Sequence, residues 1–121
     1  MNKEFIPYEQ ALELKKLGFN EPCFGWFTNS YLRIGSVVEN KHVQGEDEIL
    51  APLYQQAFRW FREKHQCESS IIAMFLPYEH YKEYQFIITY TESEIVETNF
   101  NSYEEAELAC LKKLIEVVKN K

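Results

Sequence analysis

The stretch Leu50–Gln66, LAPLYQQAFRWFREKHQ, carries the strongest helical signal in the chain. Pro52 suits the first turn of a helix, where its missing N–H is not needed, and neither Gly nor Pro recurs before Pro77. At about 100° per residue, the apolar side chains fall within an arc of roughly 160°, which is wider than one neighbouring element usually covers. We therefore predict a central helix that packs between a sheet and a second helix. The residues of this arc are Leu50, Leu53, Tyr54, Ala57, Phe58, Trp60 and Phe61.

The composition limits the kind of protein that this chain can be. With 121 residues, 45% of them hydrophobic and 16% aromatic, the chain is long enough for one domain, 1–121, with a substantial core. Its formal net charge of -6 argues against a broad nucleic-acid-binding surface, which needs clustered Lys and Arg. Neither a signal peptide nor a membrane-spanning apolar run is recognised. The cysteines Cys23, Cys67 and Cys110 are far apart and odd in number, so we expect reduced thiols in a cytoplasmic protein.

Two elements are predicted ahead of the central helix. Pro7–Leu17 is expected to be a short helix that Gly18 ends in a left-handed turn. Cys23–Val38 is expected to be a β-hairpin, in which Gly25 either weakens its strand or marks a close approach of the backbone to another group. The acidic stretch Glu39–Glu48 is interpreted as a solvated loop.

Three strands and a final helix are predicted after the central helix. Apolar residues alternate or cluster in Ser69–Leu76, Tyr84–Tyr90 and Ile95–Phe100. Ser102 begins the last helix, because Ser102 and Glu105 have the spacing of a capping box. The predicted fold is a two-layer α+β domain, an antiparallel sheet with helices mainly on one face, in the order α-ββ-α-βββ-α. The broad apolar face of the last helix is explained equally well by its own chain or by another subunit.

One candidate ligand site lies on the central helix. Arg59, Arg62 and His65 recur every three residues and form a cationic stripe. With Tyr54 or Trp60 close by, this stripe has the chemistry to receive a small anionic or nucleotide-like ligand. The alternative, which we favour, is a solvated helix face in which a neighbouring glutamate serves as the charge partner.

Other kinds of site find little support in the sequence. The α-β-β-β-α order of residues 50–119 is similar to the double-stranded-RNA-binding domain, but Glu104, Glu105 and Glu107 stand where that family places lysines. His65 and Cys67 are the only close pair of zinc-type ligands, and a second pair is missing. The remaining acids are interpreted as solvent-facing or helix-capping. We therefore predict no catalytic residue, no metal ligand and no cofactor.

Three blocks of the sequence resemble a known group of proteins. The chain resembles small proteins found in the genomes of Bacteroidetes and in the phages and mobile elements of those bacteria. This group has no established activity, so the resemblance implies a setting and supplies no site residue. The blocks are PYEQALELKKLGFNEPCFGWF (Pro7–Phe27), ILAPLYQQAFRWFREKH (Ile49–His65) and NSYEEAELACLKKLIEVVKNK (Asn101–Lys121).

Two hypotheses of function follow from these observations. The first is a non-enzymatic binding or accessory protein of phage type that acts through contact with a protein partner or with a second copy of itself. An exposed apolar patch on the hairpin or on the last helix would favour it. The second is a small anionic-ligand or nucleotide-binding domain. A small enzyme would need a Cys and a His within hydrogen-bonding distance, and nucleic-acid binding is the least supported reading.

Overall fold

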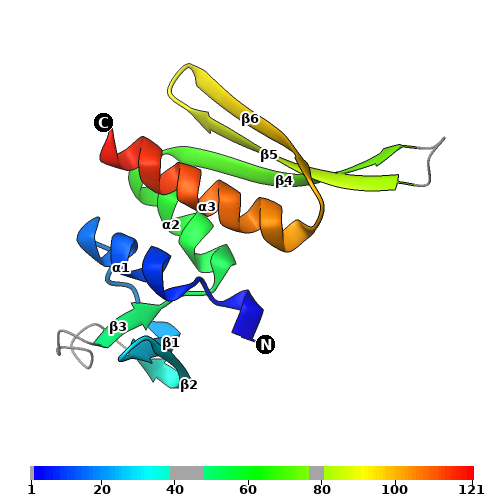
Figure 1. Cartoon of the computed structure of the whole chain (residues 1–121). Coiled ribbons are helices and arrows are strands. Elements are labelled where there is room, and N and C mark those ends of the chain that lie inside the picture. The colour runs from blue at the N-terminus through cyan, green and yellow to red at the C-terminus, as the bar shows by residue number, and fades with distance from the viewer. Residues whose placement is uncertain (1, 39–47, 77–80) are drawn as a thin grey trace. The chain divides into compact units, whose positions relative to one another are not determined.

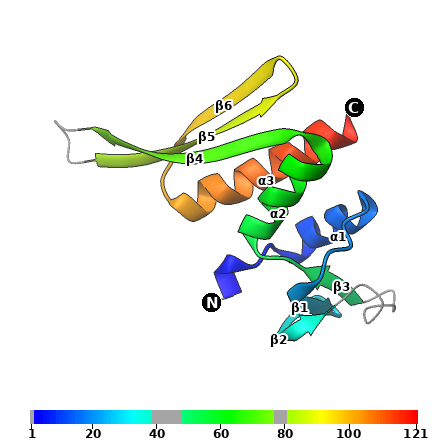
Figure 2. The same ribbon diagram turned by 180° about the vertical axis from the view of Figure 1, so that it is seen from behind.

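The computed structural model describes residues 2–38, 48–76 and 81–121, and Figures 1 and 2 show the chain from two opposite sides. The described residues form three α-helices and two three-stranded antiparallel sheets in the order α-βββ-α-βββ-α. The predicted α+β class is therefore confirmed. The elements are η1 (Asn2–Glu4), α1 (Tyr8–Lys16), β1 (Cys23–Thr28), β2 (Tyr31–Val38), β3 (Glu48–Ala51), α2 (Tyr54–His65), β4 (Cys67–Leu76), β5 (Tyr81–Tyr90), β6 (Ser93–Phe100) and α3 (Tyr103–Lys119).

The chain divides into two compact units, Met1–Ala57 and Phe58–Lys121, and the division falls inside α2. The first unit contains the sheet β2-β1-β3, and α1 packs against β3. The second unit contains the sheet β4-β5-β6, and α3 packs against all three of its strands. A helix therefore lies on a sheet in each unit, where the sequence predicted a single sheet. Whether the chain is one domain stays a prediction.

Helix α1 ends as its sequence predicts. Pro7 precedes its first residue, and Gly18 has a left-handed φ of +100°, which glycine adopts at little cost. The N–H of Phe19 donates to the carbonyl of Leu14 at 2.9 Å, and the Phe19 side chain is buried. The chain thereby turns back after α1. At the other end of the helix, the ring of Tyr8 lies edge-on to the ring of Phe27 in β1.

The β1–β2 hairpin is also confirmed. Asn29 and Ser30 connect the strands with φ values of 50° and 68°, and two such residues form the type I′ turn whose twist suits a hairpin. Two expectations were given for Gly25, and the close approach of its backbone to another group is confirmed. A Cβ at Gly25 would lie 2.7 Å from the ring of Phe5.

The start of the central helix was predicted wrongly. Residues Glu48–Ala51 form β3, which pairs antiparallel with β1, and α2 begins only at Tyr54. Pro52 therefore ends a strand and separates it from the helix. Both Leu50 and Leu53, which were counted on the helical arc, lie outside α2. Residues Glu48–Ala51 form a strand because β1 pairs with their backbone N–H and C=O groups. The residues next to them in sequence give no indication of this pairing. Of the predicted loop Glu39–Glu48, residues 39–47 lie outside the described residues.

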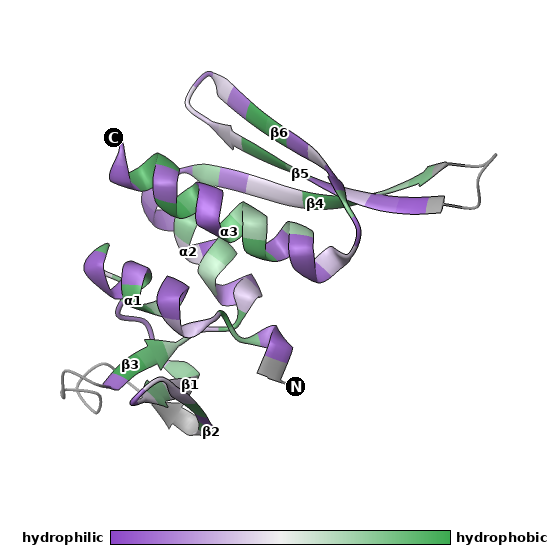
Figure 3. Ribbon diagram, in the orientation of Figure 1, coloured by the Kyte–Doolittle hydropathy of each residue, from purple (hydrophilic) through white to green (hydrophobic). Residues whose placement is uncertain are grey.

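The core of the second unit lies between α3 and its sheet. Phe86 and Ile88 of β5 are fully buried, and α3 buries Cys110, Leu111 and Leu114. Figure 3 shows hydrophobic and hydrophilic residues alternating around α3. This pattern is that of a helix with one face on a sheet and the other in solvent.

The capping box of α3 is present with one variation. The Ser102 hydroxyl accepts a hydrogen bond from the N–H of Glu105 at 3.1 Å, as predicted. The Glu105 carboxylate reaches back to the N–H of Asn101 at 3.0 Å, one residue earlier than in the standard motif. The first contact satisfies a donor that the first turn of a helix leaves without a partner, and the second ties the residue before the cap to the helix.

Candidate functional site

The five residues of the predicted ligand site lie on different sides of α2. Tyr54 and Trp60 are buried, whereas Arg59 and Arg62 are exposed and His65 is half-buried. This division follows from the helical period, because the aromatic residues belong to the apolar arc and the arginines lie opposite to it. The structure thus separates the aromatic and cationic parts of the proposed site.

His65 belongs to an aromatic cluster at the end of α2. Its ring lies edge-on to Trp60, with 4.9 Å between the ring centroids, and 6.0 Å from the ring of Phe61. The Nζ atom of Lys121 donates to the His65 carbonyl at 2.9 Å. Burial, and next the charge of Lys121, lower the pKa of His65 below its ordinary value of 6.5. His65 is therefore mainly neutral at pH 7 and adds little to a cationic stripe.

Neither of two hollows on the described surface is lined by the five predicted residues. One, of about 320 Å³, lies along the second half of α3. The other, of about 10 Å³ and with room for one water at most, lies beside α1 and β3. The predicted anion site on α2 stays a prediction. The α3 hollow is lined by Lys112, Ile115, Glu116, Lys119 and Asn120, and the second by Ala11, Lys15, Phe19, Glu48, Ile49 and Leu50.

The three cysteines are free and buried. Burial is the main cause that raises the pKa of Cys23 and of Cys110 to about 12, and it also raises the pKa of Cys67. The Cys67 thiol donates to the backbone carbonyl of His65 at 3.5 Å. A neutral, buried thiol is a poor nucleophile and a poor metal ligand. Among the described residues, no group of three His, Cys, Asp or Glu side chains could hold a metal ion.

Glu107 is a buried acid, and a buried position was not predicted from the sequence for any acid. Its side chain is on the buried face of α3, with 7% of its surface exposed. Burial, and next the charge of Glu104, raise the pKa of Glu107 to about 7. Its place three residues before Cys110 was a signal for the buried face. The general interpretation of the acids as solvent-facing or capping residues is therefore wrong for Glu107.

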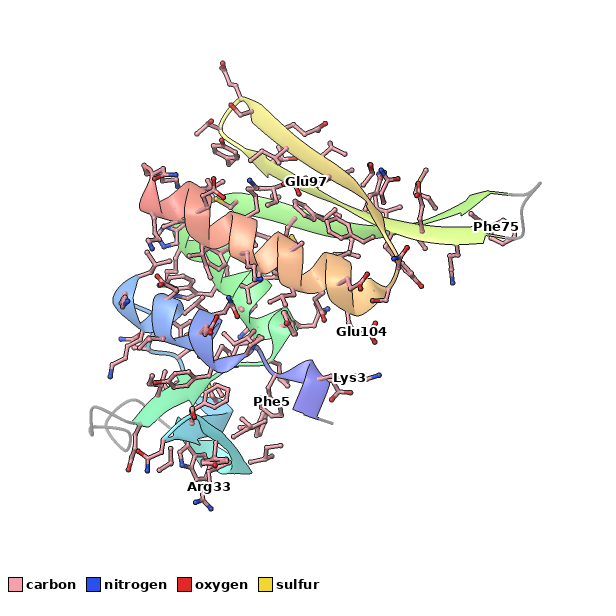
Figure 4. The ribbon with its side chains drawn as sticks, in the orientation of Figure 1. Lys3, Phe5, Arg33, Phe75, Glu97 and Glu104 are labelled. Atoms are coloured by element: carbon pink, nitrogen blue, oxygen red, sulfur yellow. The ribbon has the colours of Figure 1, made fainter. Side chains whose placement is uncertain are left out.

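An exposed apolar patch on the hairpin was considered from the sequence without naming its residues, and such a patch lies on the outward face of the β1–β2 hairpin. We call it the hairpin face, and define it as Phe24, Trp26, Tyr31 and Arg33. Phe24 is 52% exposed and Tyr31 is 73% exposed, and Trp26 lies directly across the strands from Arg33. These residues share one face because side chains alternate along a strand, and the opposite positions Cys23 and Phe27 are buried. Figure 4 shows Arg33 directed away from the sheet.

Protein-family models, curated proteins and solved structures offer no significant match to this chain. The helices of the described residues include none that is both long enough and apolar enough to cross a membrane. The resemblance to phage and mobile-element proteins remains an expectation from the sequence. Function therefore has to be inferred from the surfaces and buried groups described above.

Proposed function

We propose that this protein is a non-enzymatic accessory protein of the phage or mobile-element type and that it acts by binding another protein. The observation that supports the proposal is the exposure of the hairpin face. Two large aromatic side chains of one short hairpin, Phe24 and Tyr31, stand largely in solvent, and Trp26 lies between them in sequence.

The chemistry of the hairpin face is that of an interface centre. Tyr, Trp and Arg are the residue types that are most enriched among the energetically dominant positions of protein interfaces. Burying one exposed aromatic side chain contributes about 1.5–3 kcal/mol. A partner that suits this face offers an apolar hollow for the rings and a carboxylate for Arg33, for which the described residues provide no ion pair.

The alternative functions have less support. A net charge of -6 disfavours a role in which the same aromatic residues stack on nucleic-acid bases. An anionic-ligand site on α2 would rely on Arg59 and Arg62, which are exposed and which neither described hollow adjoins. An enzyme that used a cysteine nucleophile would need a thiolate, and the raised pKa values disfavour one at all three positions.

Affinity capture followed by reconstitution tests the proposal. The wild-type chain and the Tyr31→Ser variant are used as baits in lysate of a Bacteroidetes host, and the captured protein is then purified and titrated against both. We expect Tyr31→Ser to weaken binding about tenfold or more, because an exposed aromatic anchor is lost. Val96→Ser is the matched control, since Val96 is an exposed apolar residue of β6.

The outcome separates a specific hairpin partner from general stickiness. Equal weakening by Tyr31→Ser and Val96→Ser would show that any exposed apolar side chain contributes, and it would contradict the hairpin face. The absence of any protein that binds in purified form would contradict the proposed function itself. Far-UV circular dichroism of each variant shows whether the fold is kept.

A further inference from the structure

Strand β4 leaves a long edge of the second sheet without a strand. All ten of its residues, from Cys67 to Leu76, are in register with β5 on one side. On the other side no strand of the described residues pairs with it, because β4 is the first strand in the order β4-β5-β6. A free edge presents a row of backbone N–H and C=O groups that can accept a further strand.

The sequence of this edge lacks the usual protection against pairing. From Ser69 to Leu76, SSIIAMFL, it contains no charged residue, no Pro and no Gly. The opposite edge, β6, carries Glu94 and Glu97 and is interrupted by an irregular register near Asn99, whose φ is 71°. Charges and bulges are the devices by which natural proteins prevent edge-to-edge pairing. One edge of the sheet is therefore protected and the other is open.

The outer end of β4 is also apolar and exposed. The β4–β5 hairpin extends beyond the end of α3 in both views, so the helix does not cover it (Figures 1 and 2). Ala73, Met74 and Phe75 are all exposed there, and Phe75 retains 63% of its accessible surface. Figure 4 places Phe75 at the far end of the hairpin. An exposed Phe on an open edge is costly unless something covers it.

We propose that β4 pairs antiparallel with β4 of a second copy of this chain, so that the two sheets join into one of six strands. This dimer goes beyond the proposed function and uses a different surface from the hairpin face. A second copy suits this edge, because two copies of the uncharged stretch meet without like charges facing each other across the strands. The edge is uncharged from Ser69 onwards, so it offers nothing that would select an acidic or a basic strand.

The pairing is self-complementary when Ile71 lies on the two-fold axis. Glu68 then faces the partner's Met74, so that the one charged residue of the strand is not opposed by its own copy. Phe75 faces the partner's Cys67, at the end of β4 where Cys67 is buried. The α3 side of the sheet is the side of Phe75, because Ser69 and Ile71 share its alternation and lie directly opposite Ile88 and Phe86, the fully buried residues of β5. The exposed ring would thus lie beside the covered part of the partner's sheet.

A lysine at the edge tests the dimer without disturbing the monomer. Ser70 is exposed and points away from α3, so Ser70→Lys costs the folded monomer little. In the dimer the two lysines would lie on diagonal positions about 7–8 Å apart. Thr98→Lys on β6 is the matched control, because Thr98 is also exposed and the net charge changes equally. Sedimentation equilibrium and light scattering over a wide concentration range measure the mass of each protein.

We expect the wild type and Thr98→Lys to reach twice the chain mass of 14.5 kDa as concentration rises. We expect Ser70→Lys to remain at the chain mass, or to dimerise at least about tenfold more weakly, because like charges would be juxtaposed. Amide hydrogen exchange supplies a second measurement. Exchange in Cys67–Leu76 should slow with rising concentration in the wild type, while exchange in Ser93–Phe100 should not change.

Two results would overturn the proposed dimer. One is a wild type that stays monomeric at the highest concentration reached. The other is a dimer that Ser70→Lys leaves intact. If Tyr31→Ser dissociates that dimer instead, the hairpin face makes the contact, so the β4 edge is rejected while the proposed protein-binding function is supported. A wild type that stays monomeric but binds a purified partner through Tyr31 would also reject the β4 dimer while supporting the proposed protein-binding function.

Discussion

Glu107 places a carboxyl group on the buried face of α3, and that environment makes the stability of the fold depend on pH. Its pKa is raised from 4.5 to about 7, mainly by burial and next by the charge of Glu104. Between these two values the folded chain keeps the proton and the unfolded chain releases it. The free energy of unfolding therefore falls as pH rises through this window, and the whole cost is present above about pH 7.

Replacing Glu107 with glutamine should remove this cost. We expect Glu107→Gln to raise the free energy of unfolding at pH 8 by up to about 3 kcal/mol, because the pKa of Glu107 rises from 4.5 to about 7 and each pKa unit is worth about 1.4 kcal/mol. Near pH 4 the two proteins should differ little, since the carboxyl group is then protonated in the folded chain. Urea denaturation at both pH values measures the difference. Glu94→Gln, at an exposed position of β6, is the control, and an equal gain there would contradict the role of burial.

Gly25 is required by its neighbour and not by its backbone angles. A Cβ at this position would lie 2.7 Å from the Phe5 ring and 3.3 Å from the carbonyl oxygen of Ala51. We expect Gly25→Ala to lower the free energy of unfolding by about 1–3 kcal/mol, since the buried ring and the strand must move. Gly35→Ala is the matched control, because its Cβ would meet the Trp26 ring at an ordinary 3.6 Å. Equal denaturation midpoints for the two variants would contradict the close approach.

The first turn of α3 depends on its cap. Ser102 accepts from the N–H of Glu105, and the Glu105 carboxylate accepts from the N–H of Asn101. We expect Ser102→Ala to lower the free energy of unfolding by about 1 kcal/mol, because the Glu105 donor loses its partner. Thr98→Ala, at an exposed strand position, should change it by less than about 0.5 kcal/mol. A loss in chemical denaturation no greater than that of Thr98→Ala would show that solvent replaces the cap.

Among the elements, those with a local cause could be predicted from sequence. The left-handed Gly18, the Ser102 cap and the turn at Asn29 are each specified by residues within a few positions. Strand β3 could not be predicted in this way. Glu48–Ala51 is apolar apart from its glutamate, and the same residues suit the start of a helix. The strand is decided by β1, which is about twenty residues away in sequence.

The candidate site illustrates the same limit. The helical period places Arg59 and Arg62 opposite Trp60, so the separation of cations from aromatics was implicit in the sequence. The lowered pKa of His65 was not implicit in the sequence. It results from partial burial and from the charge of Lys121, which is distant in sequence but contacts His65 in the fold. The exposure of Phe24 and Tyr31 was also unpredictable, since strand formers in a hairpin do not reveal which face finds a covering element.

At the scale of the whole molecule, the net charge opposes the association of two copies. Each copy carries a formal net charge of -6, so two copies repel each other at a distance. We expect the dissociation constant of the proposed β4 dimer to fall several-fold as salt rises from about 0.1 M to 1 M, because the screening length shrinks from about 10 Å to 3 Å. Sedimentation at both salt concentrations measures it. Dissociation by salt would instead show that ion pairs hold the copies together.

What the sequence determined by itself is the class of fold and most of its elements. Hydrophobic periodicity, helix caps and turn residues act over a few positions, and they are sufficient to predict the helices α1 and α3, the hairpin and the meander. Tertiary structure alone decided that Glu48–Ala51 is a strand, that Glu107 is buried, and that the hairpin face and the β4 edge are left open. Each of these depends on which residues, distant in sequence, pair with a backbone group or cover a side chain. The free energy of such a contact belongs to both segments, so the sequence of one segment cannot predict it.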